Sequence, residues 1–410
     1  MTLVGDQQVA GSTADTDEAR VLELCDQLMA ELPPRSTDPR TFLGRQFDLG
    51  LAWVNFPEGR GGLGLSPKLQ KVINDTLWAA GAPVAAAPNP IGHGMGAPTV
   101  LAHGSEAQKD RYLRPLFTNE EIWCQLFSEP GAGSDVAGLA SRAVRDGDEW
   151  VVNGQKVWTT LAHVSRFGML VVRTDPNVAK HNGLTYFVVD MHAPGVEVRP
   201  LFQITGEAEF NEVYFTDVRI PDVERLGEVG DGWRVSLTTL MNERVAIGGG
   251  IPRRGSGFIG ELVKVWQSHR PADPTLARVH EDDLMRLWVR AEVLRLTNIR
   301  AGQLRAKGTP GPEGSIGKAA MAELHKDLSS FAVTLLGAEG TLFGDGYPME
   351  RPTATALWRN PPQAFLRSRA NSIEGGTTEI MKNILAERVL GLPGDIRVDK
   401  GKPWSEVPRS

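Results

Sequence analysis

A glycine-rich turn contains the residue types best suited to holding a ligand. The stretch FSEPGAGSDVAGLASRA, residues 127–143, places glycines and alanines beside the hydroxyls of Ser128 and Ser134. Glycine lets backbone N–H groups approach an anion without interference from a Cβ atom, and serine hydroxyls can donate beside them. We therefore expect this turn to contact a phosphate or the electron-rich edge of a ring.

A tryptophan segment, NGQKVWTT at residues 153–160, strengthens this interpretation. Trp158 and Thr160 are two positions apart, so on an extended strand their side chains share one face. An indole ring and a hydroxyl donor on one face suit a flat cofactor.

Other ligand signatures are absent from the sequence. The stretch PEGSIGKAA lacks a phosphate loop's first glycine and its hydroxyl residue, because Pro312 and Ala319 occupy those positions. The stretch GGLGLS from Gly61 follows no strand pattern, which argues against a dinucleotide-binding unit. There is no Gly-x-Ser-x-Gly elbow, and the 8 histidines lack metal-ligand spacing, so we expect no metal site.

The composition describes an ordinary globular chain of 410 residues, 41% hydrophobic and 23% charged, long enough for two or three packed units. With 44 Lys and Arg against 50 Asp and Glu, and no dense basic run, nucleic acid is not an expected partner. Cys25 and Cys124 lie too far apart in the sequence to suggest a disulfide framework. The absence of a long apolar run or a signal-peptide pattern predicts a cytoplasmic protein without a membrane segment.

The periodicity of apolar residues changes twice along the chain. It is helical from Glu18 to about residue 117, with residues 1–16 expected to be disordered. Short β-branched and aromatic segments separated by turn residues follow, and then the helical period returns. We predict an α+β fold with an N-terminal helical domain (1–120), a middle antiparallel β domain (121–230) and a C-terminal helical domain (231–410).

The motifs resemble those of the acyl-CoA dehydrogenase family. FSEPGAGSDVAG is similar to that family's Thr/Ser-Glu-Pro-x-Ala-Gly-Ser-Asp signature, and NGQKVWTT to its Asn-Gly-x-Lys-x-Trp-Ile-Thr segment. NSIEGGTTEIMKNILAERVLG resembles its closing signature, and the likeness extends from about Asp38 to Leu392. The resemblance implies an all-α N-terminal domain, a middle antiparallel β-barrel-like domain and a C-terminal four-helix bundle.

The resemblance also implies a reaction. FAD would accept a hydride at flavin N5 while a carboxylate removes the α-proton of an acyl-CoA, giving a trans-2-enoyl-CoA. Matched positions assign cofactor contacts to Gln125, Leu126, Phe127, Ser128, Gly133, Ser134, Trp158, Thr159, Thr160, Thr377, Thr378 and Glu379. Substrate contacts fall on Ser134, Met241, Arg244, Gly375 and Gly376. An electron-transfer flavoprotein would take the electrons, and the chain would form a homo-dimer or tetramer, or part of a hetero-oligomer.

The position of the catalytic base departs from the commonest pattern. Many members carry it in a Tyr-Glu-Gly-Thr sequence, but here Gly375 stands in the place of that glutamate and Glu374 is one residue away. The backbone N–H of Gly375 could still bond the thioester carbonyl and stabilise a developing enolate.

A second arrangement, found in isovaleryl- and long-chain-type members, puts the glutamate before an arginine on the helix after the β domain. Glu243 and Arg244 fill those positions in LMNERVAIGGG, and Leu240 and Ile247 place Glu243 beside an apolar stripe. We expect Glu243 to be the base, with Glu374 as second choice.

Other departures leave alternatives open. The usual Arg-x-x-Phe-Gly is absent, and in TLLGAEG Thr334 and Ala338 replace a glutamine and a glycine that would hold FAD. The chain could form an altered homo-oligomer, or half of a hetero-oligomer with little activity alone. A non-catalytic subunit, an acyl-CoA oxidase or a flavin monooxygenase on the same fold also fit. By analogy, a helix-borne base favours branched or bulky acyl groups.

Overall fold

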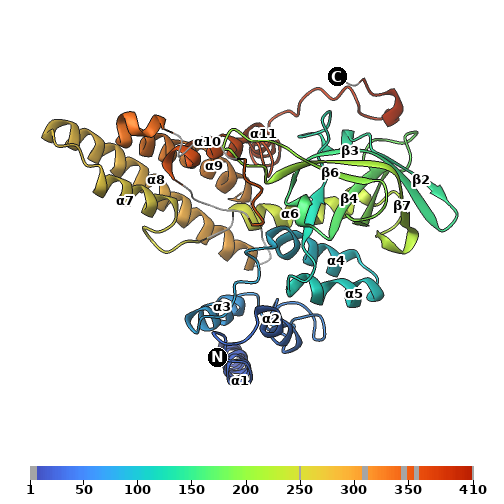
Figure 1. Cartoon of the computed structure of the whole chain (residues 1–410), viewed down its shortest axis with the longest axis horizontal. Coiled ribbons are helices and arrows are strands. Elements are labelled where there is room, and N and C mark those ends of the chain that lie inside the picture. Colours follow the sequence, from blue (N-terminus) through green and yellow to red (C-terminus); the bar gives the residue numbers. More distant parts are fainter. Residues whose placement is uncertain (1–6, 249–250, 307–312, 343–348, 355–359, 409–410) are drawn as a thin grey trace, which may run out of the picture.

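The protein is described by a computed structural model over residues 7–248, 251–306, 313–342, 349–354 and 360–408. Helices, a sheet and further helices follow one another along the chain (Figure 1), which confirms the predicted α+β order. None of the helices in these ranges is long and apolar enough to cross a membrane.

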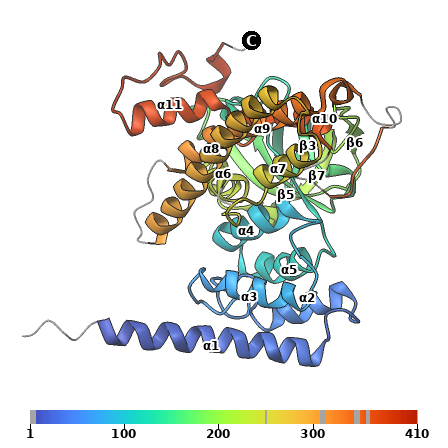
Figure 2. The same cartoon turned by 90° about the vertical axis from the view of Figure 1, so that its left-hand side faces the viewer.

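The N-terminal part is helical. Two of its helices begin at the capping residues that favour helix starts: the Asp38 carboxylate accepts from the backbone N–H of Thr41 at 3.0 Å, and Ser105 with Gln108 forms a capping box. The helices are α1 (Gln7–Glu31), α2 (Pro39–Asp48), α3 (Leu69–Ala79), α4 (Ala97–His103) and α5 (Glu106–Phe117). Figure 2 shows α1–α3 as a layer below α4 and α5, away from the sheet.

The expectation of disorder over residues 1–16 was wrong from Gln7 onward, because α1 begins there. No proline interrupts the chain between Gln7 and Val21, and extending a helix that has already nucleated adds one hydrogen bond for each residue fixed. Residues 1–6 lie outside the described ranges.

The middle strands form one mixed sheet, in the order β6-β7-β3-β2-β4-β5-β8, with β1 paired to β4. Most neighbours are antiparallel, as predicted, but β1 runs parallel to β4, and β2 meets β4 in a single parallel pair. The strands are β1 (Trp123–Leu126), β2 (Arg142–Asp146), β3 (Glu149–Thr160), β4 (Phe167–Arg173), β5 (Leu184–Asp190), β6 (Val196–Pro200), β7 (Phe210–Pro221) and β8 (Arg225–Leu226). Every residue of β4 is buried, so this strand lies in the centre of the core.

The C-terminal helices surround α9, which packs against α7, α8, α10 and α11. Their bounds are α6 (Gly232–Gly248), α7 (Phe258–Ser268), α8 (Pro274–Ala306), α9 (Glu313–Leu336), α10 (Pro361–Ser368) and α11 (Thr378–Arg388). Helix α6 contacts α4, β5 and α9, so it lies between the sheet and the other C-terminal helices (Figure 1). Glu243, in the second half of α6, is thereby brought close to β1.

Candidate active site

The glycine-rich turn and the tryptophan segment are joined by a buried ion pair. The side chain of Lys156 in β3 is fully buried. Its Nζ donates to Glu129 Oε1 at 2.8 Å and to the carbonyl oxygen of Phe127 at 3.1 Å. The backbone N–H of Val157 donates to the carbonyl oxygen of Ser128 at 2.9 Å. The two motifs therefore hold each other in a defined arrangement.

The Glu129 carboxylate also closes the turn by accepting the backbone N–H of Ala140 at 2.6 Å and of Ser141 at 3.0 Å. Burial raises the pKa of Glu129, but the ammonium of Lys156 and these hydrogen bonds outweigh burial. The pKa of Glu129 therefore lies below its ordinary value of 4.5.

A Glu129→Gln variant should differ from the wild type in a pH-dependent way. Because the pKa of the folded state is depressed, the contribution of the carboxylate to stability is fully present above the unfolded pKa and is lost as the pH falls through the folded pKa. We expect the difference in free energy of unfolding between the two proteins, measured by denaturant titration, to be constant above pH 4.5 and to shrink below it. A difference that does not change with pH would show that Glu129 is not held ionised.

The glycine-rich turn faces solvent. Gly131, Gly133 and Ser134 are all exposed. A Cβ added at Gly131 or Gly133 would meet no atom within 4 Å, so the space beside this backbone is open. A ligand can approach the N–H groups and the Ser134 hydroxyl together.

Trp158 occupies a β-bulge, where the register between β3 and β7 shifts from Lys156 to Thr159. Its φ of 59° is in the left-handed region, which a bulky residue adopts only where the surrounding structure enforces it. The indole is 58% exposed and packs edge-on against Phe210, with ring centroids 5.8 Å apart. The bulge turns the ring outward, a feature that the strand pattern did not predict.

Some residues assigned to the cofactor have side chains that face the core. Leu126, Phe127 and Thr159 are buried, so these residues do not offer an exposed side chain to a ligand at the surface of the sheet. Thr159 Oγ1 has no hydrogen-bond partner within the described part of the chain. Thr160 is partly exposed.

Helix α6 places Glu243 next to the first motif. The partly buried carboxylate has its Oε2 3.4 Å from Gln125 Nε2, near the end of β1. Met241, assigned to the substrate, is largely exposed on the same helix. The side chain of Arg244 lies outside the described part of the structure.

The loop before α11 contains two left-handed glycines, Gly375 (φ 64°) and Gly376 (φ 93°). The φ of Gly376 favours glycine, and a Cβ there would lie 2.7 Å from the terminal methyl of Met381, which would have to move. Thr377 caps α11 by accepting the backbone N–H of Ile380 at 3.1 Å. Thr378 is buried, its Oγ1 has no partner among the described residues, and Glu379 is exposed in the first helical turn.

Glu374 is held by a bidentate ion pair. Arg367 Nη1 and Nη2 donate to its two carboxylate oxygens at 3.0 and 2.9 Å, and Asn371 Nδ2 donates to Oε1 at 3.2 Å. The Arg367 guanidinium also lies 5.7 Å from the ring centroid of Phe210, which contacts Trp158. The loop before α11 is thus linked through Arg367 to the exposed indole.

Lys318 on α9 lies near the two candidate bases. Its buried Nζ donates to the carbonyl oxygen of Asn371 at 2.7 Å. Burial lowers the pKa of Lys318, and three nearby carboxylates oppose that shift: Glu374, Glu243 and Glu379. Lys318 therefore lies within electrostatic range of both candidate bases.

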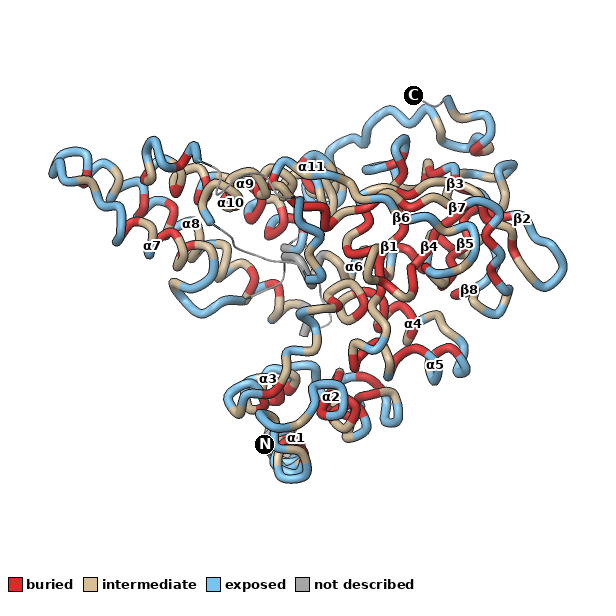
Figure 3. The backbone as a smooth tube through the Cα atoms, in the orientation of Figure 1, coloured by how far each residue is buried: buried red, intermediate tan, exposed pale blue. Residues whose placement is uncertain are grey.

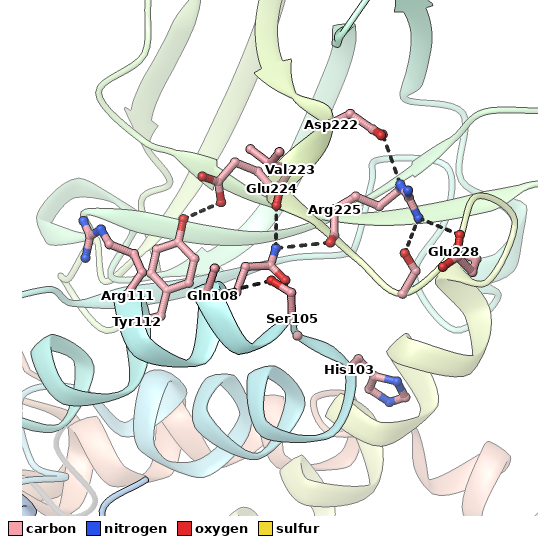
Figure 4. A pocket seen from close by; sticks show the side chains of 13 residues that line it. His103, Ser105, Gln108, Arg111, Tyr112, Asp222, Val223, Glu224, Arg225 and Glu228 are labelled. Carbon is pink, nitrogen blue, oxygen red and sulfur yellow. Dashed lines mark hydrogen bonds and ion pairs between the residues drawn. The ribbon is translucent and has the colours of Figure 1, made fainter. Parts of the chain in front are cut away.

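A separate groove of about 710 Å³ lies between α5 and residues 222–228 (Figure 4). Gln108 Nε2 donates to the carbonyl oxygens of Val223 at 2.8 Å and Arg225 at 3.2 Å, and the Tyr112 hydroxyl donates to Glu224. These polar groups satisfy one another and join the N-terminal helices to the sheet, so we assign the groove a structural role.

Comparison with known proteins identifies the family. The N-terminal, middle and C-terminal domains of acyl-CoA dehydrogenase match residues 19–120, 124–218 and 230–390. Acyl-CoA dehydrogenase IpdE1 of Mycobacterium tuberculosis is 37% identical over 353 residues, covering 85% of this chain and 86% of the relative. The chain belongs to the acyl-CoA dehydrogenase family. It is an oxidoreductase of a family that uses FAD.

Other acyl-CoA dehydrogenases agree with this assignment. FadE34 of M. tuberculosis is 39% identical over a match that covers 84% of this chain. The same match covers only 45% of FadE34, which is a longer protein. The steroid acyl-CoA dehydrogenase Tcur3481-Tcur3483 superposes with a TM-score of 0.71 at 27% identity, covering 93% of this chain and 98% of that one. The ChsE4-ChsE5 complex from M. tuberculosis superposes with a TM-score of 0.68 at 27% identity, and the match covers 96% of this chain and 100% of that one.

The site fits the flavin of an acyl-CoA dehydrogenase. Thr159 and Thr378 each leave a buried hydroxyl without a partner among the described residues, and the turn at 131–134 exposes its backbone. Buried hydroxyls and open N–H groups suit a ligand with many polar atoms, because polar groups that are buried need partners.

Lys318 and Arg367 were not predicted as site residues. Lys318 had a recognisable signal, since it shares a buried helical stripe with Ser315 and Ala322. A lysine on such a face needs partners from another element. Arg367 had no comparable signal, because its contacts with Glu374 and Phe210 depend on how α10 packs.

Proposed function

We propose that this acyl-CoA dehydrogenase oxidises an acyl-CoA to a trans-2-enoyl-CoA, with Glu243 removing the α-proton. The observation that carries the proposal is the position of the Glu243 carboxylate beside Gln125, at the first motif. The competing carboxylate of Glu374 is already held by Arg367 and Asn371. A base must reach its proton first, and a carboxylate bound on both oxygens would have to break those contacts.

The remaining assigned residues have roles that follow from their positions. The turn at 131–134, Trp158, Thr160 and Thr378 would hold FAD, which supplies the hydride acceptor when bound. The backbone N–H of Gly375 would donate to the thioester carbonyl and stabilise the charge that develops as Glu243 takes the proton. Met241 and Ser134 would contact the substrate. The three domains proposed are residues 1–120, 121–230 and 231–410.

We further propose a bulky acyl group and an electron-transfer flavoprotein as acceptor. Similar structures carry the description steroid acyl-CoA dehydrogenase at 27% identity, which supports a polycyclic acyl group. The direct test is anaerobic bleaching of the bound flavin by a panel of straight, branched and steroid-type acyl-CoAs. We expect bleaching, fastest with the bulky substrates, and slow reoxidation of the reduced enzyme in air. Rapid consumption of oxygen would instead identify an acyl-CoA oxidase.

The C-terminal helices offer a surface for a second chain. Met285, Val289, Val293 and Leu296 are exposed on α8 at helical spacing, and so form one apolar face. An exposed apolar face of this kind marks an interaction site. We propose that a copy of this chain, or a related subunit as in the two-component relatives, covers it and completes the flavin site.

Charge on this face should prevent assembly. We expect a Val289→Glu/Val293→Glu variant to give the mass of one chain by light scattering, whereas the wild type gives a dimer or larger. Val144→Glu, at an exposed position of β2, is the matched control and should assemble normally. If wild-type protein purified alone is colourless and monomeric, a separate partner subunit is required. If the double variant still assembles, this face of α8 is not the subunit interface.

A further inference from the structure

The C-terminal tail, residues 391–408, runs from α11 over the sheet, away from the other C-terminal helices (Figure 1). The matched C-terminal family domain ends at residue 390, so no family assignment covers this segment. Figure 3 shows the tail exposed over most of its length, with a buried point near its end. That point is Trp404, which is 9% exposed. Chain termini are poorly ordered unless something ties them down.

Trp404 is tied to the segment that follows the glycine-rich turn. Its Nε1 donates to the carbonyl oxygen of Gly138 at 3.1 Å, and its backbone N–H donates to the carbonyl oxygen of Val178 at 2.8 Å. The Arg173 guanidinium carbon lies 4.3 Å from the indole centroid, a cation–π distance.

Arg173 connects this contact to the turn. The side chain is buried, and it donates to the carbonyl oxygens of Ala137 at 2.6 Å and Leu139 at 3.2 Å. The indole therefore covers the guanidinium that fixes the backbone after the turn. A change at Trp404 would act on residues 137–139 through Arg173 and through Gly138 directly.

A second attachment reaches the turn itself. Lys180 Nζ pairs with Asp399 Oδ2 of the tail at 2.7 Å and with Asp135 Oδ2 at 2.8 Å. Asp135 follows Ser134, the proposed substrate contact, directly in the sequence. One lysine thus joins the tail to the residue beside the substrate contact; the pair with Asp399 is mostly shielded from water, and the Asp135 side chain is 60% exposed.

We propose that residues 391–408 form a strap that positions the glycine-rich turn, residues 131–134, and the segment after it, residues 135–139, for binding the acyl-CoA substrate. The identity of the ligand rests on the proposed function. The attachment of the tail to the turn is independent of that function. Trp404 and Asp399 are positioning residues, since they act through Arg173, Gly138 and Lys180. Holding the turn in its binding conformation before the substrate arrives reduces the ordering cost of binding.

The test compares the full-length wild type with Trp404→Ala, Trp404→Phe and Asp399→Asn, and with Ile396→Ala as a control at a tail position that is 94% exposed. In Trp404→Ala without substrate, we expect hydrogen exchange at the bonded amides of Gly138, Leu139, Ala140 and Ser141 to accelerate about tenfold, which corresponds to ~1.4 kcal/mol of local stability. In enzyme saturated with FAD, the KM for acyl-CoA should rise about tenfold while kcat stays within about twofold, because the loss is in substrate binding. Trp404→Phe, which keeps an aromatic face for Arg173, should recover part of both effects.

The two readouts separate the strap from the proposed function. If wild-type flavin is not bleached by any acyl-CoA, the proposed reaction is wrong, and hydrogen exchange alone decides whether the tail positions the turn. Unchanged exchange and KM in both Trp404→Ala and Asp399→Asn would overturn the strap. A fall in kcat of the FAD-saturated enzyme without a rise in KM would also overturn it, because the tail would then not act on substrate binding.

Discussion

Glu243→Gln should retain flavin and lose the ability to reduce it. The amide has the same shape as the carboxylate but cannot accept the α-proton, and general-base catalysis contributes about 10²–10⁴-fold. We expect the rate of anaerobic flavin bleaching by the best acyl-CoA to fall by roughly that factor. The yellow colour and the spectrum before substrate is added should match those of the wild type, because Gln125 can still contact an amide at this position.

Two further variants serve as controls for the Glu243→Gln experiment. Glu374→Gln should bleach at close to the wild-type rate, since Arg367 and Asn371 already bind that carboxylate. Glu323→Gln on the exposed side of α9 controls for a lost surface charge and should have no effect. If Glu374→Gln stops bleaching and Glu243→Gln does not, the base is Glu374. If both variants bleach normally, neither carboxylate is the base.

Lys156→Met should destabilise the whole protein. It leaves the Glu129 carboxylate buried without its ammonium partner and removes the donor to Phe127. Breaking a buried ion pair by removing one partner costs about 3–5 kcal/mol. We expect the free energy of unfolding to fall by that amount in denaturant titrations, and FAD to be lost from the protein because both motifs shift.

A second substitution distinguishes the ion pair from simple loss of packing. Lys156→Met/Glu129→Gln removes the uncompensated charge and should recover much of the lost stability, since a neutral amide costs less to bury. Arg286→Met, which breaks an exposed pair with Asp282 on α8, should cost at most about 1 kcal/mol. Equal losses in the single and double variants would show that the charge of Glu129 is not the cause.

The features that the sequence alone determined depend on residues that are close together in the chain. The periodicity of apolar residues predicted the helical, β and helical order, and the three motifs predicted the family, because both depend on neighbouring residues. The choice of Glu243 over Glu374 also began as a sequence argument, from Gly375 standing where a glutamate is usual. That choice stays a prediction until the variants are measured.

Tertiary packing decided the surroundings of those residues. The contact of Lys318 with Asn371 and the tail contact of Trp404 with Gly138 join positions far apart in the chain. Their partners depend on how α9, α10 and the tail meet the sheet, and no local pattern records that geometry. The outward turn of Trp158 comes from the mismatch in register between β3 and β7, which is a property of the pair of strands. The sequence therefore determined which chemical groups are present, and the fold decided which of them are held by partners and which face the ligand.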